Sequence, residues 1–272
     1  MNLPQQPSYQ REAKERKRRR LISRSSLIVV TIVTVGAAII AVLFFAKLFD
    51  VRAVDVVSSG LIPAGEVENI AWRVLDERRL GIARKNNILL FSPQKIRPVL
   101  ITAFPRIDSV EIRRTSLHGI EITVRERVAV GLWCLSVQNQ CFYYDADGIA
   151  FSEIASTSGY LFVPVIDERE RTIEIGSEVA PDSWRQRIFE VKKILQFGGL
   201  NASKFIIPRD ALNEFSVVVA EGWKIFYTTN FDVKRQTDNL LAFLKEKISP
   251  TEFTNLDYID LRIEDRIYYK MR

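Results

Sequence analysis

The stretch VEIRRTSLHGIEITV, residues 110–124, contains two short runs in which apolar residues occupy every second position. Charged and polar residues fill the positions between them, so each run predicts a strand with one buried and one solvated face. Leu117-His118-Gly119 separates the two runs and supplies a turn. The stretch therefore predicts an antiparallel hairpin within a small sheet.

The residues before this hairpin predict one more strand and two helices. Residues 51–57 alternate as a short strand, and residues 63–79 place apolar side chains at helical spacing. Ser92 and Pro93 are a typical N-cap and first helical residue, and Pro105 ends that helix. The order strand, helix, helix, strand, strand spans residues 49–125. These one-sided patterns favour a three-stranded sheet with two helices on one face, with the first strand at an edge.

An uncharged apolar run, LIVVTIVTVGAAIIAVLFFA, occupies residues 27–46. As a helix it would rise about 30 Å, the hydrocarbon thickness of a bilayer. A buried core helix is seldom apolar on every face over such a length. A cleaved signal peptide has a shorter apolar region that ends in a small-x-small site, and no such site follows this run. The run therefore predicts an uncleaved transmembrane helix.

The net charge of +6 is located entirely in residues 1–26, which hold eight basic and two acidic residues. The remainder of the chain is neutral, which does not fit a nucleic-acid-binding protein, because such a protein carries its basic excess on the folded part. Basic residues just before an apolar span favour a cytoplasmic N-terminus. Residues 1–26 are thus predicted to be a cytoplasmic tail, and everything after residue 47 to be extracytoplasmic.

The region 126–272 predicts a second, mixed and β-rich domain. Its last helix is followed by a proline, and its last strand ends two residues before the C-terminus. The predicted strands are 128–133, 141–144, 149–151, 160–166, 172–175, 215–219, 223–227, 258–263 and 266–270, and the predicted helices are 182–197 and 232–248.

The chain shows no arrangement of residues that is typical of catalysis. His118, the one histidine, lies in a tight turn, where neither a histidine-rich metal site nor a catalytic triad can be built. Glycine-rich phosphate-binding motifs do not occur, and the carboxylates are scattered over solvent faces. The sequence therefore predicts a non-enzymatic protein without cofactor, metal or small-molecule substrate.

Cys134 and Cys141 flank a short turn between two predicted strands. Two ligands are too few for a closed zinc site, which needs four. Directly opposed strand residues lie close enough for a disulfide, and an extracytoplasmic compartment permits one. A disulfide is the favoured interpretation, and two reduced structural thiols are the alternative.

Several motifs in sequence order resemble the bacterial cell-division family FtsQ/DivIB. FDVRAVDVVSSG (49–60) resembles the opening strand of its polypeptide-transport-associated (POTRA) module, and GIARKNNILLF (81–91) the loop before the second helix. FPRIDSVEIRRTSLHGIEITVRERVAVGLW (104–133) is similar to the strand pair and the run into the second domain. YYDADGIAF (143–151) and YIDLRIEDRIYYK (258–270) resemble two later hairpins of the family.

The resemblance implies an α+β, single-pass membrane protein with a tail (1–26), a transmembrane helix (27–46), a POTRA domain (49–125) and a β domain (126–272). It further implies a non-catalytic scaffold of the division complex at the septum of the cell membrane. The family's β domain receives a strand from the small division partners FtsB and FtsL at its C-terminal edge. The POTRA domain is linked to localisation.

The predicted last strand follows its neighbour through a two-residue turn, Glu264-Asp265, and has no later strand to pair with. Its unpaired backbone groups would form a template for a partner strand, with Tyr268 and Tyr269 as anchors and Arg266 and Lys270 attracting an acidic segment. Blunting of the edge by its charged residues is the alternative. The predicted partner-binding residues are Tyr258, Ile259, Asp260, Leu261, Arg262, Arg266, Ile267, Tyr268, Tyr269 and Lys270.

Glu126 and Arg127 occupy the predicted junction of the two domains, where an interdomain contact is one interpretation and an exposed polar pair the other. Two other functions compete with the scaffold. A POTRA-bearing transport or assembly component would normally continue into a membrane barrel, and the β domain has too few strands for one. A membrane-anchored enzyme acting on the cell wall would need the catalytic residues that the sequence lacks.

Overall fold

The structure is a computed structural model that describes residues 26–39, 41–42, 49–58, 60–76, 78–79, 83–84, 87–88, 92–155 and 162–272. Residues 26–39 and 41–42 are helical. In the described part of the chain, no helix combines the length and the apolar character needed to cross a membrane. The predicted basic tail, apart from residue 26, and residues 40 and 43–46 of the predicted membrane span lie outside the described residues.

The chain divides into two compact units, and the division crosses two strands of the first sheet. The domain boundary expected between residues 125 and 126 stays a prediction. The first unit contains Met1–Ser58, Pro63–Leu100 and Glu111–Thr123, and the second contains Ser59–Ile62, Ile101–Val110 and Val124–Arg272.

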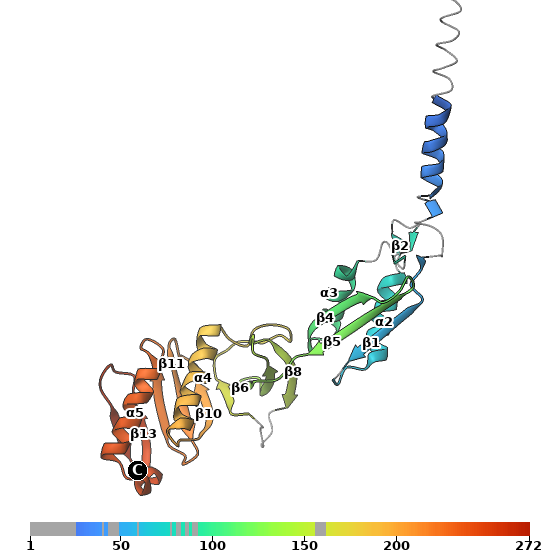
Figure 1. Cartoon of the computed structure of the whole chain (residues 1–272). Coiled ribbons are helices and arrows are strands. Elements are labelled where there is room, and N and C mark those ends of the chain that lie inside the picture. Colours follow the sequence, from blue (N-terminus) through green and yellow to red (C-terminus); the bar gives the residue numbers. More distant parts are fainter. Residues whose placement is uncertain are drawn as a thin grey trace, which may run out of the picture. The chain divides into compact units, whose positions relative to one another are not determined.

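The first sheet has the predicted element order, strand, helix, helix, strand, strand (Figure 1). Among the described residues its three strands lie in the order β1-β5-β4, so β1 is at an edge, as expected. A two-stranded hairpin between the helices was not predicted from the sequence. The elements are β1 (Ala53–Ser58), α2 (Ala64–Asp76), β2 (Arg78–Arg79), β3 (Ala83–Arg84), α3 (Pro93–Ala103), β4 (Ile107–Arg114) and β5 (Gly119–Glu126).

The apolar periodicity of these elements explains their burial. Val67 and Leu75 of α2 are almost fully buried, and so is Leu100 of α3. Ile120 and Ile122 of β5 are fully buried, while Glu121 between them is half-buried. The mixed α+β character that the alternating and helical patterns predicted is therefore confirmed for this region.

The second unit is built on one large sheet with two long helices (Figure 1). In the described residues this sheet has nine strands in the order β14-β13-β12-β11-β10-β9-β6-β7-β8. The pairs β6·β9, β9·β10 and β12·β13 are parallel, and the other pairs are antiparallel. Its elements are β6 (Gly131–Leu135), β7 (Gln140–Tyr144), β8 (Ala150–Ala155), β9 (Pro164–Asp167), α4 (Asp182–Phe197), β10 (Ala202–Ile207), β11 (Glu214–Val219), β12 (Lys224–Thr228), α5 (Val233–Lys247), a 3-10 helix (Pro250–Asn255), β13 (Leu256–Asp260) and β14 (Tyr268–Met271).

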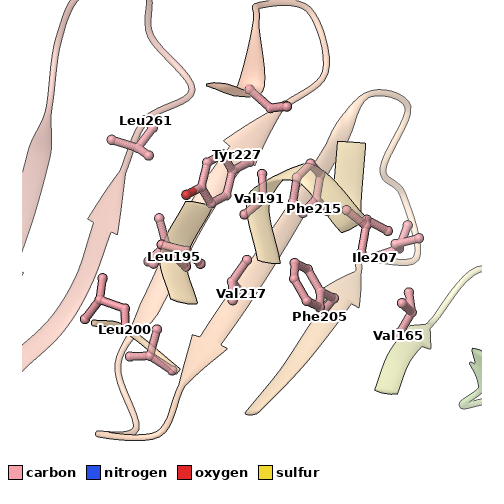
Figure 2. Close-up of a cluster of buried hydrophobic side chains, with 14 of the residues drawn as sticks. Val165, Val191, Leu195, Leu200, Phe205, Ile207, Phe215, Val217, Tyr227 and Leu261 are labelled. Carbon is pink, nitrogen blue, oxygen red and sulfur yellow. The ribbon is translucent and has the colours of Figure 1, made fainter. Parts of the chain in front are cut away.

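The core of the second unit forms where α4 and α5 pack on this sheet. Val191 and Leu195 of α4 point toward the rings of the central strands (Figure 2). Phe215 and Tyr227 stack with ring centroids 5.1 Å apart, and Phe205 lies 6.4 Å from Phe215. Such buried aromatic pairs contribute about 0.5–1.5 kcal/mol each beyond the area they bury.

The strand predicted at residues 172–175 was wrong. These residues form no strand in the described structure. Ile173 is buried in the core instead. Residues 202–207 were not predicted as a strand and form β10. The alternation of buried Phe205 and Ile207 was the available signal.

Candidate partner-binding edge

β14 lies at one edge of the large sheet, and within the described residues only β13 pairs with it. The antiparallel register sets Tyr258 opposite Lys270, Ile259 opposite Tyr269 and Asp260 opposite Tyr268. All four residues of β14 are exposed. The last strand of the chain therefore presents an open backbone edge.

The connection between β13 and β14 is longer than the predicted two-residue turn. Residues 261–267 lie outside both strands, and Asp265 takes a positive φ of 55°. Arg235 of α5 holds this segment, since its guanidinium lies 2.6 Å from Asp265 and 3.9 Å from Glu264. These ion pairs draw the connection toward α5, beside a hollow of about 580 Å³. Arg266 and Ile267 consequently lie before β14, which corrects the prediction that they belong to the strand.

One hydrogen bond determines which backbone groups of β14 face outward. The amide of Arg272 donates to the carbonyl of Asn255 over 2.7 Å, so the backbone of residue 272 points inward. Because backbone direction alternates along a strand, Tyr268 and Lys270 also point toward β13. The N–H and C=O groups of Tyr269 and Met271 therefore point away from the sheet.

The side chains of β14 lie alternately on the two faces of the sheet. The Tyr269 ring packs on Phe243 of α5 with centroids 5.3 Å apart, so it lies on the helix-covered face. Tyr268 and Lys270 lie on the other face. Lys270 Nζ donates to Asp257 over 2.8 Å, and this hydrogen bond raises the pKa of the Lys270 ammonium. Tyr268 and Tyr269 are 47% and 50% exposed, which leaves about half of each side chain available to a partner.

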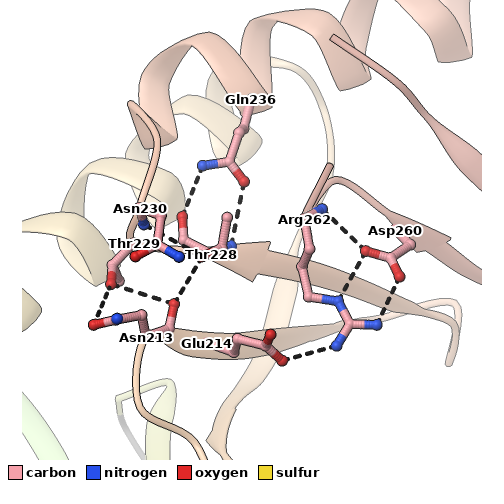
Figure 3. A network of polar contacts seen from close by, with 8 residues as sticks. All are labelled: Asn213, Glu214, Thr228, Thr229, Asn230, Gln236, Asp260 and Arg262. Carbon is pink, nitrogen blue, oxygen red and sulfur yellow. Dashed lines mark hydrogen bonds and ion pairs between the residues drawn. The ribbon is translucent and has the colours of Figure 1, made fainter. Parts of the chain in front are cut away.

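Asp260 and Arg262 are engaged within the second unit. Arg262 Nε and Nη2 donate to the two Asp260 oxygens over 2.9 and 2.7 Å, and Nη1 donates to Glu214 over 2.8 Å (Figure 3). These hydrogen bonds raise the pKa of Arg262. Burial opposes ionisation of Asp260, but the hydrogen bonds from Arg262 outweigh it and lower the Asp260 pKa. The Arg262 guanidinium also stacks 5.0 Å above Phe226.

Among the other predicted contact residues, two are buried in the core. Ile259 and Leu261 are at most 3% exposed, so their side chains stabilise β13 rather than face a partner. Tyr258 is half-buried and packs edge-on against Phe226 at 5.7 Å. Their predicted roles in partner binding stay predictions, while the exposed part of the set is concentrated on β14.

Sequence reasoning missed Gln236, a buried amide that locks α5 onto β12. Its Oε1 accepts from the Thr228 amide at 3.3 Å, and its Nε2 donates to the Thr228 carbonyl at 2.8 Å (Figure 3). Thr228 Oγ1 in turn donates to the Asn213 carbonyl over 3.1 Å. A polar residue on the apolar face of the 232–248 helix was the signal.

The side chains of Glu126 and Arg127 contact residues of the second unit. Glu126 Oε1 accepts from the Ile62 amide at 2.8 Å and lies near Arg106. The Arg127 amide donates to the Arg106 carbonyl over 2.8 Å, and its guanidinium pairs with buried Asp145. Both side chains are largely buried, at 14% exposure each. Their predicted interdomain role stays a prediction.

Asp108, Asp145 and Asp147 bring carboxylate oxygens close together in the described part of the structure. The Arg127 guanidinium pairs with Asp145 and lies 3.9 Å from Asp108. A positive charge is thus already present among these carboxylates, and their grouping gives no support to a metal site.

Cys134 and Cys141 are joined by a disulfide, with their Cα atoms 3.9 Å apart. They face one another directly in the register of β6 and β7. Both are buried, together with Leu132 and the half-buried Tyr143 and Ile166. The bond therefore fastens the β6–β7 hairpin at its turn.

Comparison with known proteins identifies one region of the chain. Residues 77–127 match the family model of the POTRA domain, FtsQ-type. The matched segment contains the second helix and the hairpin of the first sheet, together with Glu126 and Arg127. No curated protein matches the chain. The chain thus carries an FtsQ-type POTRA domain, and this supports its resemblance to the FtsQ/DivIB family.

Proposed function

We propose that this protein is a non-catalytic scaffold of the bacterial cell-division complex, which recruits and binds partner division proteins at the septum. The observation that carries the proposal is the FtsQ-type POTRA domain at residues 77–127. Domains of this type are generally non-enzymatic. The second unit complements it with an open strand edge, which suits a binding protein.

The proposed topology is a single pass through the cell membrane. Residues 1–26 form the cytoplasmic tail, residues 27–46 span the bilayer, and the two folded regions lie outside the cytoplasm. The basic excess before an uncharged run of membrane length supports this orientation. A disulfide between Cys134 and Cys141 agrees with a compartment that permits oxidation.

The proposed partner site is the outer edge of β14, where an FtsB/FtsL-like segment would add as a further strand. The outward N–H and C=O groups of Tyr269 and Met271 would supply its hydrogen bonds. Tyr268 and Tyr269 would anchor it on the two faces, because each is about half exposed. Asp260 and Arg262 would act indirectly, by holding β13 in place behind the docking strand.

The experiment that tests the function is the position of the protein in dividing cells. A fluorescent protein fused to the cytoplasmic N-terminus should give a band at mid-cell. Deletion of residues 50–125 with the apolar run retained should disperse this band over the membrane. A uniform membrane signal from the full chain would contradict the scaffold role, and an unchanged band after the deletion would contradict recruitment by the POTRA domain.

A further inference from the structure

We propose that the end of the POTRA domain nearest residues 27–46 is a binding surface for anionic phospholipid headgroups. This inference rests on the proposed membrane anchor. The surface consists of Arg52 and the β4–β5 turn with Arg114 and Leu117. We call it the headgroup surface.

Tether length keeps this surface close to the bilayer. Asp50 lies four positions after Ala46, the last residue of the apolar run, and four positions span at most about 14 Å. At Asp50 the chain is already part of the domain, because Asp50 forms a β-bridge with Asn87 and its carbonyl lies 3.1 Å from His118 Nδ1. If residues 27–46 span the membrane, this end of the domain lies near the membrane surface whatever conformation the linking residues adopt.

The β4–β5 turn is fastened to the same end. The amides of Arg52 and Ala53 both donate to the His118 carbonyl, over 2.7 and 3.1 Å. Leu117, the preceding residue, is 66% exposed at the tip of the turn. Arg52 and Arg114 are both exposed. An apolar tip is thus combined with two cationic residues next to the first structured residues after the anchor.

This combination matches the chemistry of an anionic bilayer surface. A leucine can enter the boundary between headgroups and acyl chains, while guanidinium groups remain at the level of the phosphates. Each cation near such a surface contributes about fivefold to binding at physiological salt. Neutralising Arg52 and Arg114 together should therefore weaken the contact by about 25-fold.

The test uses the full chain reconstituted into vesicles of phosphatidylcholine alone or of equimolar phosphatidylcholine and phosphatidylglycerol. A single cysteine, Leu117→Cys, carries an environment-sensitive fluorophore, since both native cysteines are held in a buried disulfide. Lipid with a nitroxide near the headgroup quenches any fluorophore that reaches the membrane interface. The control is Val57→Cys, in β1 of the same unit, at a residue that is 51% exposed and lies toward the other end of the strand from Arg52.

We expect strong quenching at position 117 in the anionic vesicles, weak quenching at 117 in neutral ones, and much weaker quenching at position 57 in both. The double variant Arg52→Gln, Arg114→Gln should need a higher fraction of phosphatidylglycerol in the vesicles to reach the same quenching. Absent quenching at 117 in a chain that resists alkaline extraction from the vesicles would overturn the headgroup surface alone. Equal quenching in both lipids, or at both positions, would overturn it as well. If alkali releases the chain from the vesicles, both the proposed membrane anchor and this inference are overturned.

Discussion

The direction of one backbone N–H group allows the docking edge to be tested at the level of a single hydrogen bond. In β14 the amide of Tyr269 points away from the sheet, and the amide of Lys270 points toward β13. Proline removes the N–H donor and places its ring in the same direction. Tyr269→Pro should therefore weaken binding of a partner strand while the free protein keeps the ladder between β13 and β14.

The matched control for this variant is Tyr269→Val. Both substitutions remove the ring that packs on Phe243, and valine alone keeps the N–H group and favours a strand. The difference between them thus isolates the outward donor. One lost hydrogen bond is worth about 0.5–1.5 kcal/mol, which corresponds to about 2- to 13-fold in the dissociation constant. The proline ring blocks close approach of the partner, so the upper end of this range is expected.

The assay is titration of the purified full chain in detergent with a labelled extracytoplasmic segment of an FtsB/FtsL-like partner. Thermal unfolding of each variant provides the fold control. Lys270→Pro should lower the stability of the free protein, because it removes an inward donor of the ladder. Equal partner affinity of Tyr269→Pro and Tyr269→Val would refute strand addition at β14. Loss of stability in Tyr269→Pro but not in Lys270→Pro would refute the assigned backbone directions.

Three further predictions concern the second unit behind this edge. Gln236→Met should destabilise the second unit by about 2–4 kcal/mol, because it leaves the buried N–H and C=O of Thr228 without the Gln236 amide as partner. The control, Asn239→Met on the exposed side of α5, should change the stability little, and equal urea midpoints for the two variants would contradict the role of Gln236. Replacing Cys134 and Cys141 by serine should cost at least about 2.5 kcal/mol on the chain-entropy account of a closed eight-residue loop, which a urea titration against wild type would measure. The Asp260 pKa is lowered in the folded state, so the contribution of Asp260 to stability should be present above about pH 4 and be lost as the pH falls further. Asp260→Asn should therefore reduce the loss of unfolding free energy below about pH 4. An unchanged dependence of stability on pH would count against the pair of Asp260 and Arg262.

Local patterns were sufficient for much of this architecture. Alternation in residues 110–124 predicted the β4–β5 hairpin, and helical spacing with caps predicted α2, α3, α4 and α5. Asp232 is the N-cap of α5, where its side chain accepts from the Arg235 amide. These signals are local, because strand faces repeat every two residues and helix faces every three to four. The apolar run and the basic tail could also be identified from the sequence alone.

Pairing between distant segments decided what the sequence could not. In the large sheet, β9 pairs with β6 on one side and with residues 202–207 (β10) on the other, whereas residues 172–175 form no strand in the described structure. Likewise, Arg235 reaches across thirty positions to Asp265 and lengthens the connection before β14, so Arg266 and Ile267 leave the strand. Ion pairs and strand partners of this kind depend on which surfaces meet after folding. The edge position of β14 in the described sheet agrees with the sequence prediction, whereas the outward direction of the Tyr269 backbone was shown only by the tertiary hydrogen bond from Arg272 to Asn255.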